Sequence, residues 1–272
     1  MKSKLSTLSF LLLTVFLPYS SWAEESGNFS VGIAYINGSS IYSNTKTSRI
    51  IMPSLSYETD KIIINVQNGF TYKIINDQTT KFNVSLAPNF KPYSKNDSSD
   101  LIGMERNMYV DGLVSVSREL SRGLSAKLDV GTELTGRFNG STANMSLSQF
   151  IPINSVPFIL SLGSRWYDQK RANYLYGVYS TEATGLRAKY ELNSVFVPYI
   201  SINTFYSISE NTRFFAGLNA NFLSKTIGAL LVLITLSALG LIFFKFALSS
   251  FTDIFKNGSG SLLKSHKYPQ DA

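Results

Sequence analysis

The sequence predicts an all-β protein, and within that class an up-and-down transmembrane β-barrel of about eleven or twelve strands. Three observations predict this fold. Segments with a two-residue period recur along the chain, the connections between them alternate between short and long, and the chain begins with an export signal. The composition agrees, because 44% of the residues are hydrophobic and 13% aromatic while only 16% are charged.

The first 23 residues have the three parts of a secretory signal peptide. Lys2 and Lys4 supply positive charge, residues 5–17 are apolar, and the small residues Ser21 and Ala23 form a cleavage site. We therefore expect residues 1–23 to be removed and the exported barrel to occupy residues 24–226.

The clearest strand is expected at residues 213–223. Phe214 and Phe222 lie on one apolar face, while Asn219 and Asn221 lie on the other. Such a strand fits a barrel wall with lipid on one side and water on the other. Similar segments precede it at residues 29–36, 49–57, 61–66, 70–75, 82–90, 110–117, 126–134, around 145–147, 158–162 and 196–203.

The connections between these segments fall into two classes. Short ones are expected at residues 58–60, 76–79, 119–123, 152–157 and 209–212. Longer ones alternate with them at 37–48, 91–107, 135–142 and 166–195, with the short turn at 67–69 as the exception. This sorting is typical of an outer-membrane barrel, in which the short turns face the periplasm. Lys127, Asp129 and Glu133 share one parity and are expected to face the lumen.

The segment after the last expected strand has no such alternation. Residues 227–244 are eighteen residues without a charge, which is about long enough for a membrane-spanning helix. We therefore predict an apolar transmembrane helix at residues 227–248, a polar tail at 249–272, and no strand that closes the barrel. The helix could be a genuine anchor, or the chain end could result from a reading-frame change. We favour the second, because an apolar helix conflicts with export to the outer membrane.

The order and spacing of several motifs resemble those of the MltA-interacting protein family (MipA/OmpV). The similarity covers about residues 28–225, and the C-terminus departs from the family pattern. The motifs are Trp166-Tyr167-Asp168, Tyr174, Tyr176-Gly177-Val178, Thr184-Gly185-Leu186, Tyr190, Leu101-Ile102-Gly103-Met104 and Val31-Gly32-Ile33-Ala34-Tyr35.

The resemblance implies a Gram-negative outer-membrane barrel that is not an enzyme. Its function would be that of a scaffold in peptidoglycan assembly, linking a lytic murein transglycosylase to a murein synthase. Two alternatives stay open, a pore for small solutes and a surface adhesin or receptor that uses the long loops. The expected partners are outer-membrane lipid and the two murein enzymes, with no nucleic acid.

Residues suited to catalysis or metal binding are scarce in this chain. The chain has no cysteine, and its one histidine, His266, lies in the polar tail. A hydrolase triad needs a histidine inside the folded domain, and a transition-metal site needs a cluster of ligands. Glu182 and Glu191 lie in one loop, but their spacing fixes no geometry for an acid–base pair. We predict no catalytic residues, no metal site and no cofactor.

One group of aromatic residues is the remaining candidate site. Trp166, Tyr167, Tyr174, Tyr176 and Tyr179 lie close together in sequence. They could form a belt at the membrane interface or a patch that binds a protein partner, since both surfaces favour Trp and Tyr. Arg165, Lys170 and Arg171 flank this group and are expected to be solvated.

Overall fold

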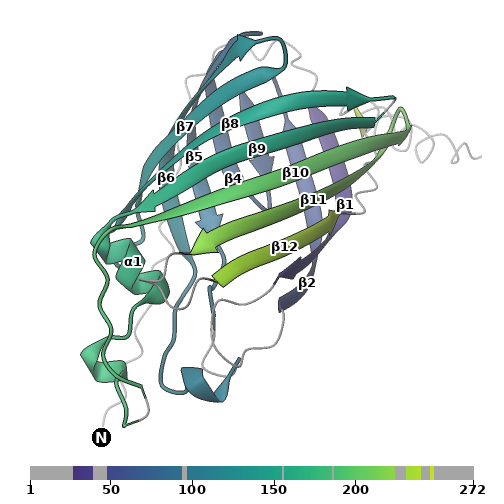
Figure 1. The fold of residues 1–272 in the computed structure, drawn as a ribbon. Coiled ribbons are helices and arrows are strands. Elements are labelled where there is room, and N and C mark those ends of the chain that lie inside the picture. Colours follow the sequence, from purple (N-terminus) through teal and green to yellow (C-terminus); the bar gives the residue numbers. More distant parts are fainter. Residues whose placement is uncertain are drawn as a thin grey trace, which may run out of the picture.

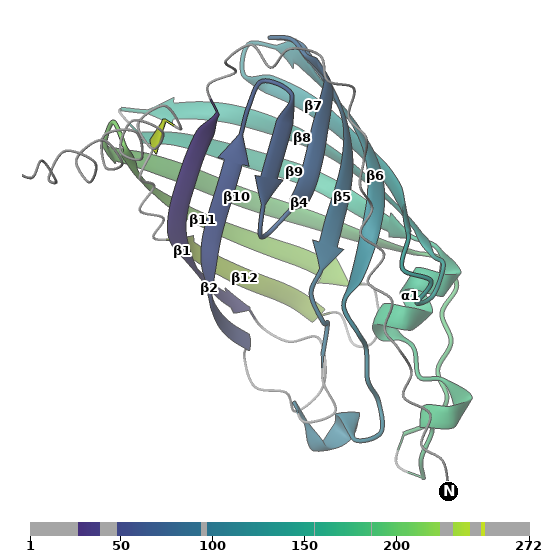
Figure 2. The same ribbon diagram turned by 180° about the vertical axis from the view of Figure 1, so that it is seen from behind.

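The computed structural model describes residues 27–38, 48–93, 97–154, 156–185, 187–223, 231–239 and 246–247. They form one antiparallel sheet in which each strand pairs with the next along the chain. β12 also pairs with β1, so that the sheet closes into a barrel (Figure 1; the opposite wall is seen in Figure 2). The predicted up-and-down barrel is therefore confirmed as an all-β, antiparallel, up-and-down sheet.

The strands coincide with the expected segments from the first to the eleventh. Their bounds are β1 Asn28–Gly38, β2 Ser48–Glu58, β3 Ile62–Asn65, β4 Gly69–Asn76, β5 Thr80–Asn89, β6 Tyr109–Ser121, β7 Leu124–Glu133, β8 Ser141–Ile153, β9 Val156–Tyr167, β10 Val195–Ser209, β11 Thr212–Leu223, β12 Leu231–Leu239 and β13 Phe246–Ala247. The helices are α1 Gln169–Tyr176, and the 3-10 turns η1 Ser99–Leu101 and η2 Ser180–Glu182.

The prediction of a helix at residues 227–248 is wrong, because Leu231–Leu239 is the strand β12. β12 pairs with β11 from Leu223↔Leu231 to Phe215↔Leu239, and it pairs with β1 from Tyr35↔Ala238 to Gly38↔Thr235. Without it, β11 and β1 would each present a row of unpaired backbone groups, which is costly in a membrane. Nine residues are also about the length that a membrane-spanning strand needs.

Among the described residues, no helix is long and apolar enough to cross a membrane. The signal peptide at residues 1–23 and the polar tail at 249–272 lie outside the described residues and stay predictions, as does the origin of the chain end.

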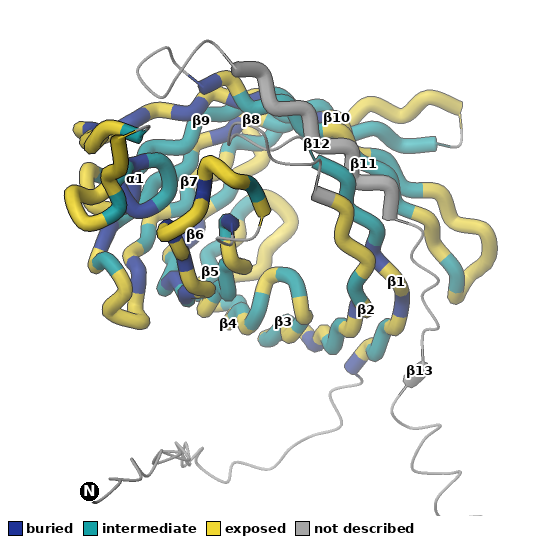
Figure 3. Tube along the Cα trace, turned by 90° about the horizontal axis from the view of Figure 1, so that it is seen from below, coloured by how far each residue is buried: buried dark blue, intermediate teal, exposed yellow. Residues whose placement is uncertain are grey.

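The barrel wall is apolar outside and polar inside. On β7, Leu128 and Val130 are 42% and 49% exposed, whereas Lys127 and Asp129, one residue away, line the interior. Figure 3 shows exposed and less exposed residues alternating along the strands. Since polar residues of a membrane barrel face the lumen, this alternation is the arrangement that the two-residue period predicted.

The connections sort onto two ends, as expected. The turns at 59–61, 77–79, 122–123, 154–155 and 210–211 join strands at one end. The connections at 90–108, 134–140 and 168–194 join them at the other, together with α1 and the 3-10 turns (Figure 1). Buried apolar side chains gather mainly at this long-loop end, in one cluster around Ala172 and Leu192 and another around Tyr93 and Met104.

Candidate functional site

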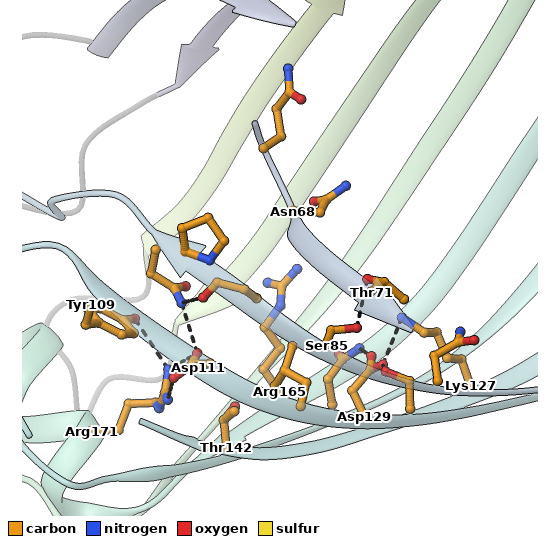
Figure 4. Close-up of a pocket in the computed structure, with 18 of the residues that line it drawn as sticks. Asn68, Thr71, Ser85, Tyr109, Asp111, Lys127, Asp129, Thr142, Arg165 and Arg171 are labelled. Atoms are coloured by element: carbon orange, nitrogen blue, oxygen red, sulfur yellow. Dashed lines mark hydrogen bonds and ion pairs between the residues drawn. The ribbon is translucent and has the colours of Figure 1, made fainter. Parts of the chain in front are cut away.

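The interior of the barrel holds a polar cavity of about 620 Å³. Side chains from β3 to β9, from the β3–β4 turn and from α1 line it, and most of them are amides, hydroxyls or charged groups. Figure 4 shows its wall, with Asp111 and Arg171 near one end and Lys127 and Asp129 near the other. The volume lies within the range of about 300–1,000 Å³ that is common for ligand-binding cavities.

A row of polar residues crosses the wall of this cavity because the strands pair in register. Ser115 of β6 is opposite Asp129 of β7, Asp129 is opposite Asn144 of β8, and Asn144 is opposite Arg165 of β9. The Ser115 hydroxyl and the Asn144 amide both donate hydrogen bonds to Asp129, and Lys127 forms an ion pair with it at 2.8 Å. The charge of Asp129 is therefore fully compensated within the row.

Arg165 has a different environment at the end of the same row. Its guanidinium donates a hydrogen bond of 2.7 Å to Asn221 Oδ1 and lies 4.2 Å from the centre of the Tyr199 ring. The Tyr199 ring can take this position only because residue 163 is a glycine, since a Cβ there would lie 2.5 Å from the ring. The position of Arg165 is thus fixed by neutral neighbours.

Arg171 joins the first helix to the barrel wall. It is 2% exposed, and its guanidinium donates two hydrogen bonds to the Asp111 carboxylate, one of them at 3.0 Å. The rings of Tyr109 and Phe138 each lie 5.3 Å from it. Asp168 caps the helix by accepting a hydrogen bond from the Arg171 N–H, which starts α1 directly after β9. α1 is therefore held against the lumen at the long-loop end.

Arg106 is the centre of a second cluster in the long loops. It forms an ion pair with Glu182 and donates hydrogen bonds to the backbone oxygens of Tyr174 and Gly177. Burial alone would raise the pKa of Glu182, but the hydrogen bonds from Arg106 and from the Tyr179 N–H hold that pKa below its usual value. The cluster ties the loop at 90–108 to the loop at 168–194.

The five aromatic residues of the candidate patch lie in three different settings. Tyr167 and Tyr176 lie together against the Ala172 cluster, with ring centres 6.4 Å apart. Tyr174 and Tyr179 both lie against Arg106. Trp166 follows Arg165 on β9 and therefore lies on the opposite face of the strand from the lumen. Tyr167 is connected to Tyr174 through Arg171 and Tyr109. That the five residues serve as an interfacial belt or a partner patch stays a prediction.

The three cations that flank the patch also differ from one another. The expectation that Arg171 is solvated is wrong, because its charge is neutralised by Asp111 inside the molecule. Arg165 lines the lumen, and Lys170 is exposed as expected. Sequence reasoning missed Arg106 and Arg171 as structural centres, since their partners lie 76 and 60 residues away along the chain.

The remaining candidates are also placed. Glu182 pairs with Arg106, and Glu191 pairs with Lys189, so the two carboxylates belong to different ion pairs. His266 lies outside the described residues. Within the described ranges, no group of three or more His, Cys, Asp or Glu side chains could hold a metal ion.

Comparisons with known proteins add the following findings. The family model described as MltA-interacting protein MipA matches residues 31–229. Two curated relatives from Escherichia coli, of strains K12 and O157:H7, are each named "Putative outer membrane protein YiaT". Each is 24% identical over 203 residues, which cover 72% of this chain and 80% of the relative.

Two solved structures are similar in outline. The first is described as the NanC porin, with a TM-score of 0.39 and 11% identity over 80% of this chain and 98% of that chain. The second is described as the CymD monoaromatic hydrocarbon channel, with a TM-score of 0.40 and 8% identity over 83% of this chain and 90% of that chain.

Proposed function

Because the chain belongs to the MltA-interacting protein MipA family, we propose that it is a scaffold that binds a lytic murein transglycosylase and links it to a murein synthase. The family match over residues 31–229 is the observation that carries this proposal. The protein itself is a non-enzymatic outer-membrane barrel, as the sequence motifs implied.

The short-turn end of the barrel is the proposed docking surface. Barrels of this kind turn their short connections toward the periplasm, where murein and its enzymes lie. Two neighbouring hairpins, β6–β7 and β8–β9, place large apolar side chains at this end. Leu120 is 56% exposed and Ile153 is 53% exposed. Exposed apolar groups of this kind are suited to a protein partner.

Retention of the purified MltA transglycosylase on the immobilised barrel tests the proposal. We expect the barrel to retain the enzyme, and we expect the pair of changes Leu120→Ser and Ile153→Ser to reduce retention. Ile102→Ser is the matched control, because Ile102 is 66% exposed in a long loop at the other end. Absence of retention by the unmodified barrel, or equal loss with Ile102→Ser, would contradict the proposed surface.

A pore for small solutes is the second candidate, and the polar cavity in the lumen favours it. A barrel whose interior were filled by apolar side chains would have no such space. Steady conductance of the purified protein in planar bilayers is the expected result. A barrel that inserts but does not conduct would exclude this candidate and leave the scaffold proposal standing.

A further inference from the structure

The charges that line the lumen cavity do not balance. Five of its described lining residues are charged, namely Lys127, Arg165, Arg171, Asp111 and Asp129. Arg171 forms an ion pair with Asp111, and Lys127 forms one with Asp129, so each carboxylate already neutralises one cation. Among the described residues, Arg165 contacts the amide of Asn221 and the ring of Tyr199, and neither carries a negative charge. The described wall of the cavity therefore has one uncompensated positive charge.

The Arg165 side chain is also oriented for recognition. Its stacking on Tyr199 and its hydrogen bond to Asn221 restrict the guanidinium before any ligand arrives. In Figure 4 its guanidinium points away from the strand, in the space between Asp111 and Asp129. A planar guanidinium held in this way matches the geometry of an oxyanion and forms paired hydrogen bonds with it. Little side-chain freedom would be lost on binding, which favours affinity.

The rest of the lining sets the chemistry of the remainder of the ligand. Asn68, Asn83, Thr71 and Gln67 from the opposite part of the wall offer amide and hydroxyl groups. Such groups hydrogen-bond to hydroxyl-rich solutes. The lining residues whose side chains are wholly apolar are Ile63, Ala87, Pro88 and Leu113. We propose that the lumen binds a small hydroxyl-rich organic anion and that Arg165 pairs with its carboxylate.

The inference is independent of the scaffold proposal. It gives the pore candidate a class of solute, and it rests on that candidate only for passage of the solute through the barrel. Binding is therefore measured at equilibrium on the purified barrel, without a membrane potential, and conductance is measured separately. Binding without conductance would exclude the pore and keep the site, whereas conductance without binding would overturn the site and keep the pore.

The test uses D-glucuronate, D-glucose 6-phosphate and D-glucose as probes in isothermal titration. Because only the two anions can pair with Arg165, we expect glucuronate to bind saturably and neutral glucose weakest. The phosphate ester shows whether a phosphate can take the place of the carboxylate. Arg165→Gln should weaken glucuronate binding about tenfold or more, because hydrogen bonds to charged groups are among the stronger ones. Arg122→Gln removes the same charge from an exposed turn and should leave binding unchanged.

A second variant keeps the arginine and compensates its positive charge with a new carboxylate. Asn221→Asp places a carboxylate beside the Arg165 guanidinium, where the amide oxygen now lies at 2.7 Å. It should abolish the preference for glucuronate over glucose, whereas Asn211→Asp in the exposed β10–β11 turn should not. Heat-modifiable gel mobility confirms that each variant is folded. Equal binding of glucuronate and glucose by the unmodified barrel, or unchanged affinity in both lumen variants, would overturn the proposal.

Discussion

At the scale of single residues, two buried arginines organise the long-loop end of the barrel. Arg106 and Arg171 are each 2% exposed, and each contacts one carboxylate and several aromatic rings. A buried guanidinium is tolerated when its charge is paired. All three nitrogens of Arg106 donate hydrogen bonds, whereas Arg171 donates from its two terminal nitrogens and its Nε has no partner among the described residues. The ring faces add favourable cation–π contacts around the charge. The loops are thus held by polar centres as well as by the two small apolar clusters.

Replacing Arg171 should release α1 from the barrel wall. Arg171→Met leaves the Asp111 carboxylate buried without its cation, and the loss of one partner of a buried pair costs about 3–5 kcal/mol. We expect proteinase K to cleave the 168–194 loop much faster in this variant. Lys170→Met is the control, because Lys170 is the exposed neighbour on the same helix. Equal cleavage of the two variants would show that the pair does not hold the helix.

Acid should loosen the Arg106 cluster through Glu182. The folded-state pKa of Glu182 is lowered, although burial opposes the shift, so its contribution to stability is complete above the ordinary value of 4.5. That contribution is lost as the pH falls through the lowered folded-state pKa. Protease resistance of the long loops should therefore decrease below about pH 4.5. In Glu182→Gln the loops should already be sensitive at pH 7 and change less on acidification.

The exposed pair formed by Glu191 provides the control for this titration. Glu191 and Lys189 are 59% and 52% exposed, and solvent-exposed pairs contribute little to stability. Glu191→Gln should keep the acid-induced loss seen in the unmodified chain. The assignment to Glu182 would fail if Glu182→Gln and the unmodified chain lost protease resistance in parallel.

At the scale of elements, β12 is the strand on which closure depends. It satisfies the backbone of β11 along nine residue pairs and that of β1 along four. In this register Thr235 and Ser237 are opposite Asn219 and Gly217 of β11. The β-branched residues Val232, Ile234 and Thr235 favour a strand over a helix in this setting.

A proline in β12 should prevent closure of the barrel. Leu236 pairs with Leu218 of β11 and with Asn37 of β1, so a residue there has a strand on each side. Leu236→Pro removes a ladder hydrogen bond, and proline is excluded from central strands. We expect loss of the fast-migrating unheated form on gels. Leu236→Val is the matched control and should keep it, and persistence of that form in the proline variant would contradict the role of β12.

At the scale of the whole molecule, the barrel separates an apolar exterior from a polar, charged interior. Neighbouring positions on one strand therefore have opposite tolerance for charge. Leu218 of β11 is 41% exposed on the outer face, and Asn219 follows it on the inner face. The apolar outer surface of a membrane barrel faces lipid, and its polar lumen faces water. Each face of a strand is therefore stable only with residues suited to its own solvent.

A pair of lysine substitutions on β11 tests this division. Leu218→Lys places a charge on the lipid side, where lysine costs about 2–4 kcal/mol at the midplane of the membrane. Asn219→Lys places the same charge on the lumen side, where it should be tolerated. Urea unfolding in lipid vesicles should show a clear loss of stability only for Leu218→Lys. Equal losses would mean that the two faces are not sorted as described.

The sequence by itself determined the all-β class, the first eleven strands, the two classes of connection and the family. These features are local, because a two-residue period and a short turn each depend only on consecutive residues. The polar parity of β7 likewise predicted that Lys127 and Asp129 face the lumen, where the structure places them.

Only the tertiary structure decided how the barrel closes and which charges it buries. Residues 231–239 have almost no polar–apolar alternation, so their sequence does not predict a strand. They form one because they pair with the otherwise free edges of β11 and β1. From the sequence alone, Arg171 is expected to be a surface charge, because its partner Asp111 lies 60 residues away along the chain. Arg165 is likewise expected only to flank the aromatic group, and the strand register places it in the lumen. Pairing between distant residues depends on strand order and register, and no short stretch of sequence contains either.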